Sequence, residues 1–435
     1  MKSKITKIQN LFMKGIAIIV ATMVVFTPVI NASTSLDDNN TAFENIINTI
    51  VHGTIGNTVE SIKKHFDSGN ITLVISNEQQ LRALAEYVNT GNDCSGKIIK
   101  LGNDINVNSN EDWVPIGNDE NSFRGKFDGN YHMISGIKFN RNNKLNSELS
   151  NVGLFGYVEN AYIKNVKIEN SILSIPYNLN QDILGSSLDI KIQLENGNIK
   201  LSNETYSKLG TIVGYNNEGI IENCAIKNVE IYGLKDVAGI VGYNNNGRVS
   251  NCIVENCNVK AIENVGGIVG SNYNGIIEKC VNKASILALK TVGGIVGYCE
   301  GNEDLKSLIK YSINMGKINS LVGYVGGIAG ICMLTDIEAC DNNENVEICI
   351  NDEELQALKS YIAITSGESN ITINQTDVGG IVGSITGVKK NDNEILSIVN
   401  SCINYAKVVG ANNVGGLVGN LNRIYNAYIF NKSIK

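Results

Sequence analysis

Histidine is scarce in this chain of 435 residues, which contains only His52, His65 and His132. None of them has a partner at the spacing that zinc ligands use, and the HExxH pattern of zinc proteases does not occur. The sequence therefore predicts no metal site, no cofactor and no recognisable catalytic motif. His132, inside the segment FDGNYHMISG, is interpreted as a structural residue.

Charge is also limited, because Asp, Glu, Lys and Arg together make up 18% of the residues, against 43% hydrophobic residues. Such a balance excludes a disordered chain and predicts a large buried core. Lys and Arg form no cluster of the kind that binds phosphates, so nucleic acid is excluded as a partner. After Ile30 no apolar run reaches the length of a membrane span, and membrane contact is expected only through the N-terminal segment, if that segment stays uncleaved.

The N-terminal segment differs from the rest of the chain. Four lysines precede an apolar stretch from Gly15 to Ile30, and the small residues Ala32 and Ser33 follow it. This order is typical of a secretory signal peptide, here predicted at 1–32, and an uncleaved membrane anchor is the alternative. Cleavage would remove the four lysines and change the formal charge from -7 to -11. We therefore expect a secreted or cell-surface protein.

Proline is rare, with three residues, whereas glycine is frequent, with 44. Glycine and asparagine accept positive φ angles that most residues avoid, so they suit tight turns. The composition favours many short strands joined by turns and disfavours long helical bundles.

One short phrase, VGGIVG with its variants, recurs along most of the chain. Its copies start at Val152, Leu209, Val237, Val265, Val292, Val325, Val378 and Val414. The starts at 209, 237, 265 and 292 lie 28, 28 and 27 residues apart, and each unit contains three short apolar runs. A single unit cannot bury its inner face, but units stacked about 4.8 Å apart can pair every strand with its equivalents. The period predicts a parallel β-solenoid with three strands per coil.

Stacked coils bring equivalent residues together in ladders. Glycine is expected where neighbouring backbones approach too closely for a Cβ atom, at Gly239, Gly242, Gly267, Gly270, Gly294 and Gly297. A ladder of cysteines is expected at Cys224, Cys252, Cys280, Cys340 and Cys402, with Ser312 replacing cysteine in one coil. Adjacent coils would hold the Cβ atoms about 4.8 Å apart, beyond the usual range for a disulfide, so buried free thiols are favoured.

Tyrosine recurs just after the glycine phrase, at Tyr157, Tyr215, Tyr243 and Tyr298. These rings are predicted to form a broken column along one face of the solenoid. One hypothesis is that exposed rings bind sugars by stacking. The alternative is that the rings pack on one another and support the coil.

The region before the first glycine phrase has helical periodicity. Helices are expected at Thr41–Val51 and Val59–Phe66, followed by a strand at Thr72–Ile75. A further helix over Glu78–Asn89, with Ser76 or Asn77 as its N-cap and Gly91 as its stop, would cover the open edge of the first coil.

From Ile75 onward the segments WVPIG, FRGKFDGNYHMISGIKF and VGLFG follow one another, before the glycine phrases. In these motifs the chain resembles the GLUG-repeat family, and is similar to the β-helical N-terminal regions of secreted immunoglobulin A peptidases and to bacterial adhesin repeats. The resemblance implies an all-β fold, a right-handed parallel β-helix with an N-terminal capping helix, and it also implies export and surface display. It does not carry catalysis, because the peptidases hold their HExxH zinc site in a separate domain.

The predicted organisation is a signal peptide at 1–32, a short helical segment at 33–74 and a solenoid at 75–435. Insertions are expected at about 171–207 and 341–376, the second with a short helix over Asp352–Tyr361, and both are candidate contact surfaces.

Two classes of function remain open from the sequence. The preferred one is an exported scaffold that binds a host or environmental protein or glycan without catalysis, including a non-catalytic relative of the immunoglobulin A peptidase N-terminal region. The alternative is an enzyme that degrades polysaccharide or protein with carboxylates such as Asp119, Asp128, Asp236 or Asp377.

Overall fold

The computed structural model describes residues 58–108, 111–140, 150–175, 192–195, 198–201, 208–348, 377–390, 393–410, 413–421 and 427–430. The chain divides into two compact units, Met1–Ile47 and Asn48–Lys435, and the described residues all belong to the second. The predicted signal peptide and the helices predicted at Thr41–Val51 and Asp352–Tyr361 lie outside the described residues. Within the described part of the chain, no helix has the length and apolar character needed to cross a membrane.

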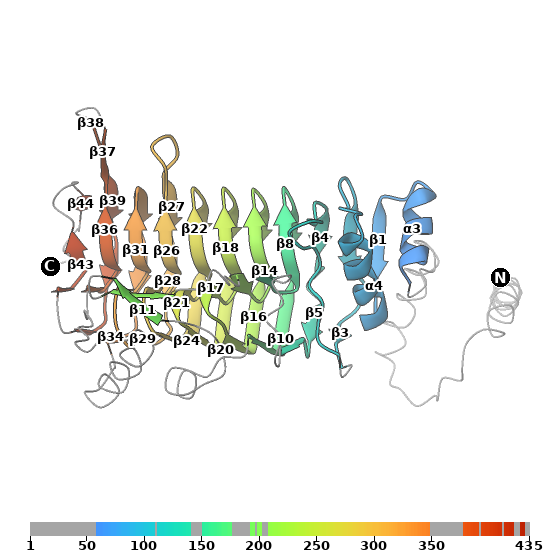
Figure 1. The fold of residues 1–435 in the computed structure, drawn as a ribbon, viewed down its shortest axis with the longest axis horizontal. Helices are drawn as coiled ribbons and strands as arrows, with labels where there is room; N and C mark the ends of the chain where they lie inside the picture. The colour runs from blue at the N-terminus through green and yellow to red at the C-terminus, as the bar shows by residue number, and fades with distance from the viewer. Residues whose placement is uncertain are drawn as a thin grey trace, which may run out of the picture. The chain divides into compact units, whose positions relative to one another are not determined.

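Two helices and one strand begin the described part of the second unit (Figure 1). They are α3 (Val59–Asp67), β1 (Thr72–Ile75) and α4 (Glu78–Asn89). The N-cap of α4 is Asn77, whose side-chain oxygen accepts a hydrogen bond of 2.9 Å from the backbone N–H of Gln80. The periodic apolar face of α4 is buried in the same core as the coils. The helix predicted over Glu78–Asn89 therefore has the bounds and the buried face that its sequence indicates.

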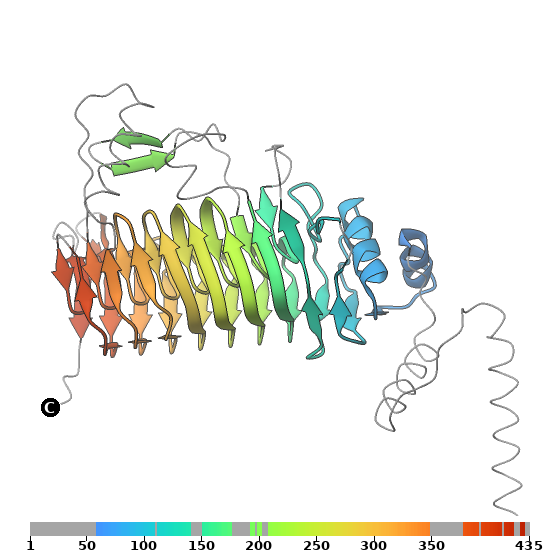
Figure 2. The ribbon, with the colours of Figure 1, turned by 90° about the horizontal axis from the view of Figure 1, so that it is seen from below.

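Four long parallel sheets, A to D, contain most of the remaining strands, which stack level upon level in Figures 1 and 2. Sheet A consists, in order, of β1, β2 (Ile98–Leu101), β4 (Lys126–Asp128), β9 (Tyr162–Lys164), β15 (Ile220–Glu222), β19 (Arg248–Ser250), β23 (Ile276–Glu278), β27 (Ser307–Lys310), β32 (Thr335–Glu338), β39 (Ser397–Asn400) and β44 (Ala427–Phe430). Its register pairs Thr72 with Ile98, so the sheet begins at Thr72, three residues before the predicted start of the solenoid.

Sheet B lies next along each coil. Its strands are β3 (Ile105–Asn106), β5 (Met133–Ser135), β6 (Lys138–Asn140), β10 (Lys167–Ser174), β16 (Ala225–Tyr232), β20 (Ile253–Ala261), β24 (Val281–Ala288), β28 (Ile313–Asn314), β29 (Ile318–Ser320), β33 (Asp341–Asn342), β34 (Val346–Ile348), β40 (Ile403–Asn404) and β41 (Val408–Val409).

Sheets D and C contain the two halves of the glycine phrase. Sheet D consists of β7 (Asn151–Val152), β13 (Lys208–Gly210), β17 (Lys235–Ala238), β21 (Glu263–Gly266), β25 (Val292–Gly293), β30 (Val325–Gly326), β35 (Val378–Gly379) and β42 (Val414–Gly415). Sheet C consists of β8 (Phe155–Glu159), β14 (Val213–Asn217), β18 (Val241–Asn245), β22 (Val269–Tyr273), β26 (Val296–Glu300), β31 (Ala329–Met333), β36 (Val382–Thr386) and β43 (Val418–Leu421).

The parallel β-helix predicted from the repeat is confirmed, because each glycine phrase pairs in register with the next. Leu209 pairs with Val237, and Val237 pairs with Val265. The prediction of three strands per coil was wrong, since a regular coil has four: β17, β18, β19 and β20. The apolar run Arg248–Val254 is divided between β19 and β20 because Asn251 bends the chain at a φ of +53°.

The insertions start later than predicted. Strand β10 continues to Ser174, which pairs with Tyr232, so the first insertion starts after 174 and not at 171. Strands β33 and β34 pair with β28 and β29, so the second starts after Ile348 and not at 341. The ladders extend this far because inward residues such as Leu173 and Val346 remain fully buried. Two antiparallel hairpins lie outside the four sheets, β11 (Ile192–Glu195) with β12 (Asn198–Leu201) and β37 (Val388–Lys390) with β38 (Asn393–Ile395).

Candidate functional site

Tyrosine rings form a continuous column on sheet C. The ring centroids of Tyr157 and Tyr215 lie 4.7 Å apart, and those of Tyr215 and Tyr243 lie 5.0 Å apart, with interplanar angles of 13° and 9°. This parallel stacking follows from the coil spacing, because equivalent side chains on adjacent parallel strands lie about 4.8 Å apart. The coil therefore aligns three of the four predicted tyrosines directly.

The predicted break in the column is filled by a tyrosine that the sequence interpretation missed. Ser271 occupies the position equivalent to Tyr243, but Tyr273 lies two residues further on the same face of β22. Its ring lies 5.1 Å from that of Tyr243 and 5.7 Å from that of Tyr298. The period of two along a strand is the signal that would have identified Tyr273. We call Tyr157, Tyr215, Tyr243, Tyr273 and Tyr298 the tyrosine column.

Each ring of the tyrosine column is half-buried, and the faces of Tyr215 and Tyr243 are turned toward the rings on either side. Stacked rings leave their edges, and not their faces, available to a ligand. Burial, followed by the nearby Tyr215, raises the pKa of Tyr157 to about 12, and burial also raises the pKa of Tyr243. The hydroxyl groups therefore stay protonated at neutral pH and can donate hydrogen bonds. The geometry is that of ring-on-ring packing, and ligand binding by these tyrosines stays a prediction.

A cation lies against the column. The Nζ atom of Lys208 lies 4.6 Å from the ring centroid of Tyr215 and 5.3 Å from that of Tyr243, within the range of cation–π attraction. Burial lowers the pKa of Lys208, and the charges of Asp236 and Asp119 oppose that change. Lys208 is the first residue of β13, so the site combines the start of a strand in sheet D with the middle of β14 in sheet C.

The carboxylate of Asp236 borders the same face. Its Oδ1 atom accepts hydrogen bonds from Asn264, at 2.9 Å, and from the hydroxyl of Ser271. Burial raises the pKa of Asp236, although these two donors act in the opposite direction. Ser271, at the position equivalent to Tyr243, thus supplies a hydrogen-bond partner to a buried carboxylate beside the tyrosine column.

Of the other carboxylates singled out by the sequence, Asp119 also acts on Lys208, whereas Asp128 and Asp377 have other partners. Asp377 accepts hydrogen bonds from Asn413 and Asn420, near the last coil. Asp119 accepts from Asn151, and Asp128 lies on sheet A with Lys164 at 3.1 Å. Among the residues that the structure describes, no group of three His, Cys, Asp or Glu side chains is placed to hold a metal ion.

The glycines of the phrase lie where coils nearly touch. A Cβ atom added at Gly239 would lie 2.4 Å from the carbonyl oxygen of Gly267, and one added at Gly267 would lie 2.3 Å from that of Gly294. Cβ atoms added at Gly242, Gly270, Gly294 and Gly297 would likewise lie within 2.5 Å of backbone atoms of an adjacent coil. The close approach inferred from the repeat is therefore present at all six positions.

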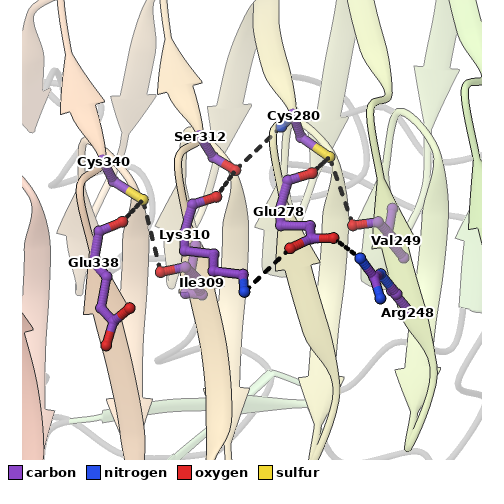
Figure 3. Close-up of polar contacts among 9 residues, drawn as sticks. All are labelled: Arg248, Val249, Glu278, Cys280, Ile309, Lys310, Ser312, Glu338 and Cys340. Carbon is purple, nitrogen blue, oxygen red and sulfur yellow. Dashed lines mark hydrogen bonds and ion pairs between the residues drawn. The ribbon is translucent and has the colours of Figure 1, made fainter.

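The cysteines form the expected ladder at the turn between sheets A and B. Cys280 and Cys340 flank Ser312 in Figure 3, and the hydroxyl of Ser312 accepts a hydrogen bond of 3.2 Å from the backbone N–H of Cys280. The nine described cysteines are free and buried: Cys94, Cys224, Cys252, Cys257, Cys280, Cys299, Cys332, Cys340 and Cys402. Burial raises the pKa of Cys94 to about 12 and that of Cys257 to about 11, which makes both thiols unreactive while folded.

Charged residues on the outer face of sheet A form ion pairs across the coils. Figure 3 shows the buried carboxylate of Glu278 between Arg248 on one neighbouring strand and Lys310 on the other. The Lys310 Nζ atom lies 3.3 Å from Glu278. Burial alone would raise the pKa of Glu278, but the hydrogen bonds and charges of Arg248 and Lys310 outweigh it and lower the pKa below its ordinary value of 4.5.

This lowered pKa predicts an acid-sensitive contribution to stability. Because the folded pKa lies below the unfolded one, Glu278 stabilises the fold above pH 4.5 and loses that effect as the pH falls through its folded pKa. Glu278→Gln should therefore be less stable than the wild type at pH 7, and the difference should shrink as the pH falls below 4.5. Chemical unfolding at a series of pH values measures the difference.

Glu338→Gln is the matched control, because Glu338 lies on the same outer column and makes no ion pair with any described residue. The free energy of unfolding of Glu338→Gln should differ little from that of the wild type at every pH. If Glu278→Gln lowers the free energy of unfolding as much at pH 3 as at pH 7, the lowered pKa of Glu278 is contradicted.

Two of the three histidines are described, and each contacts one polar group of a neighbouring segment. His65 lies 2.7 Å from the carbonyl oxygen of Thr72, and His132 lies 3.2 Å from Asp104. His52 lies outside the described residues.

Comparison with known proteins finds one similar crystal structure and one matching family motif. The chain is similar to a crystal structure of "a putative immunoglobulin A1 protease from Bacteroides ovatus", with 22% sequence identity and a TM-score of 0.45, over 62% of this chain and 74% of that one. No curated protein matches the chain significantly. The model of the GLUG motif matches residues 262–287, which run from the turn before β21 into β24. The predicted resemblance to the GLUG-repeat family is confirmed, and this chain is a repeat protein that carries the GLUG motif.

Proposed function

We propose that the protein is an exported repeat scaffold that binds a partner along the tyrosine column and catalyses no reaction. The observation that supports this most is the alignment of five tyrosines on five successive strands of sheet C, with Lys208 against them. Tyrosine is among the residues that contribute most to protein interfaces, since a ring offers apolar area and its hydroxyl a hydrogen bond. The basic start and apolar stretch of the chain support export to the outside or to the cell surface.

The orientation of the rings favours a protein partner over a glycan. A sugar that stacks on tyrosine needs a free ring face, and in this column the faces of Tyr215 and Tyr243 are turned toward other rings. The edges and hydroxyls remain, and they suit a polypeptide that lies along the column and accepts hydrogen bonds. We therefore propose a host or environmental protein as the partner class.

The test compares retention and cleavage in one experiment. The full chain is incubated with immobilised mucin, either intact or deglycosylated, and both the bound chain and the mucin fragments are quantified. We expect retention on both forms without fragments. Retention on intact mucin alone would point to a glycan and overturn the proposed partner class, and release of fragments or absence of retention would overturn the scaffold function.

A substitution in the tyrosine column tests whether this face of sheet C binds the partner. Tyr243→Ser should lower retention about tenfold or more if the column is the contact surface, and the natural Ser271 shows that the same column position accepts serine. Tyr232→Ser is the matched control, because Tyr232 lies on sheet B and bonds to Glu230. Equal losses in the two variants would contradict a binding role for the column.

A further inference from the structure

The last step of the tyrosine column differs in geometry from the others. The rings of Tyr273 and Tyr298 lie 5.7 Å apart and are tilted by 40°, whereas the three earlier steps have interplanar angles of 13°, 9° and 19°. Tilted rings cover each other's faces less fully than parallel rings do. Between the neighbouring strands β22 and β26 of sheet C (Figure 1), part of a ring face is therefore left uncovered by the other ring.

A carboxylate lies beside this step. Glu300 follows Tyr298 by two residues on β26, so both side chains are on the outer face of sheet C, and both are half-buried. The hydroxyl of Tyr298 donates a hydrogen bond of 2.7 Å to Glu300. Burial is the main cause that raises the pKa of Tyr273 and Tyr298, and Glu300 raises both further. The carboxylate therefore acts on both rings of the tilted step.

Glu300 has no cationic partner of the kind that supports other outward carboxylates. On the outer face of sheet B, for example, Glu255 pairs with Lys283 of the adjacent strand at 3.4 Å. The residues in register with Glu300 on its two neighbouring strands are Tyr273 and Met333, which carry no charge. Within the described part of the chain, Glu300 forms no ion pair. A cation from a bound partner would supply the missing charge.

The tyrosine column already holds one cation elsewhere. Lys208 lies 4.6 Å from the ring centroid of Tyr215 and 5.3 Å from that of Tyr243, so rings in this arrangement attract a positive charge. The formal net charge of the whole chain is -7, which favours the approach of basic partners. Both observations favour a cation over an anion at the Glu300 end of the column.

We infer that Tyr273, Tyr298 and Glu300 form the subsite for a basic side chain, lysine or arginine, of the polypeptide that binds along the tyrosine column. The inference rests on the proposed function and names the chemistry of its partner. The ammonium or guanidinium group of the partner pairs with the Glu300 carboxylate and lies against the tilted rings. A neutral side chain at the same place would leave the carboxylate without a counter-charge, so the subsite selects a cation.

Binding of labelled hexalysine to the full chain, followed by fluorescence anisotropy, tests the subsite. Glu300→Gln keeps an acceptor for the Tyr298 hydroxyl and removes only the charge, and it should weaken hexalysine binding about fivefold. Glu230→Gln is the matched control, because Glu230 accepts a hydrogen bond of the same 2.7 Å from Tyr232 on sheet B. The control changes the net charge equally and should leave the affinity for hexalysine nearly unchanged.

Equal losses in the two variants would show that hexalysine responds to net charge alone and would overturn the subsite. Absence of hexalysine binding, hexaglutamate binding as tight as that of hexalysine, or an affinity that Glu300→Gln leaves unchanged would also overturn it. Retention on mucin separates the two proposals. If Tyr243→Ser lowers retention while Glu300→Gln leaves hexalysine binding unchanged, only the subsite is wrong. If Tyr243→Ser leaves retention unchanged, the proposed function itself fails.

Discussion

Gly267→Ala should lower the free energy of unfolding by about 3 kcal/mol, the upper part of the range for overpacking in a close-packed interior. The added Cβ would lie 2.3 Å from the carbonyl oxygen of Gly294 and from the side chain of Asn282. Gly294 lies in the bend between β25 and β26, which both pair with coils on either side, so its carbonyl cannot move away without disturbing the ladder. Chemical denaturation followed by circular dichroism measures the loss.

The matched control is Gly416→Ala. Gly416 holds the same place in the last glycine phrase, but a Cβ there would meet no atom within 4 Å. Its effect should stay within about 0.5 kcal/mol, as for most surface substitutions. If the two substitutions have equal effects, close packing of coils is not the reason for glycine in the phrase.

Asn244→Ala should also cost about 3 kcal/mol, through loss of hydrogen bonds inside the stack. The Asn244 side chain is fully buried and continues a ladder of amides, in which Asn216 donates to Asn244 and Asn244 donates to Asn272, both at 2.6 Å. Removing it leaves an N–H of Asn216 and the oxygen of Asn272 without these partners, and each unsatisfied group costs roughly 1–3 kcal/mol. Thermal and chemical unfolding measure the loss.

Asn245→Ala is the neighbouring control. Asn245 also bonds along the stack, to Asn217 at 2.8 Å, but it lies on the outer, half-buried face where water can replace the bond. We expect a cost below about 1 kcal/mol. A cost at Asn245 equal to that at Asn244 would show that burial does not set the value of the ladder.

The recurring phrase predicted the stack, and with it the ladders. The period determines which residues meet, because each parallel strand must pair with its equivalent in the next coil. The glycine and cysteine ladders therefore followed from spacing alone. Helix α4 was also predictable, since Asn77 as a cap and the apolar spacing of Leu81, Leu84 and Val88 specify a helix locally.

Spacing did not predict where each coil bends. The strand boundaries depend on positive φ angles at particular turn residues, such as Asn251, and Lys279 takes the same angle at the equivalent place of the next coil. A residue type therefore does not specify the bend by itself. The starts of the insertions were missed for a related reason, because only pairing with a neighbouring strand shows that Leu173 and Val346 still belong to the core.

The candidate site divides in the same way. The sequence by itself determined that tyrosines stack, because equal positions on successive coils must lie about one strand spacing apart. The period of two along β22 could also have identified Tyr273, but only the tertiary structure showed that Lys208 lies against the rings and that the ring faces are turned toward one another. These contacts join residues from different strands and sheets, and their geometry depends on side-chain direction and coil curvature. The repeat period specifies which residues are paired on adjacent coils, whereas the shape of the folded coil determines which residues of different strands and sheets are in contact.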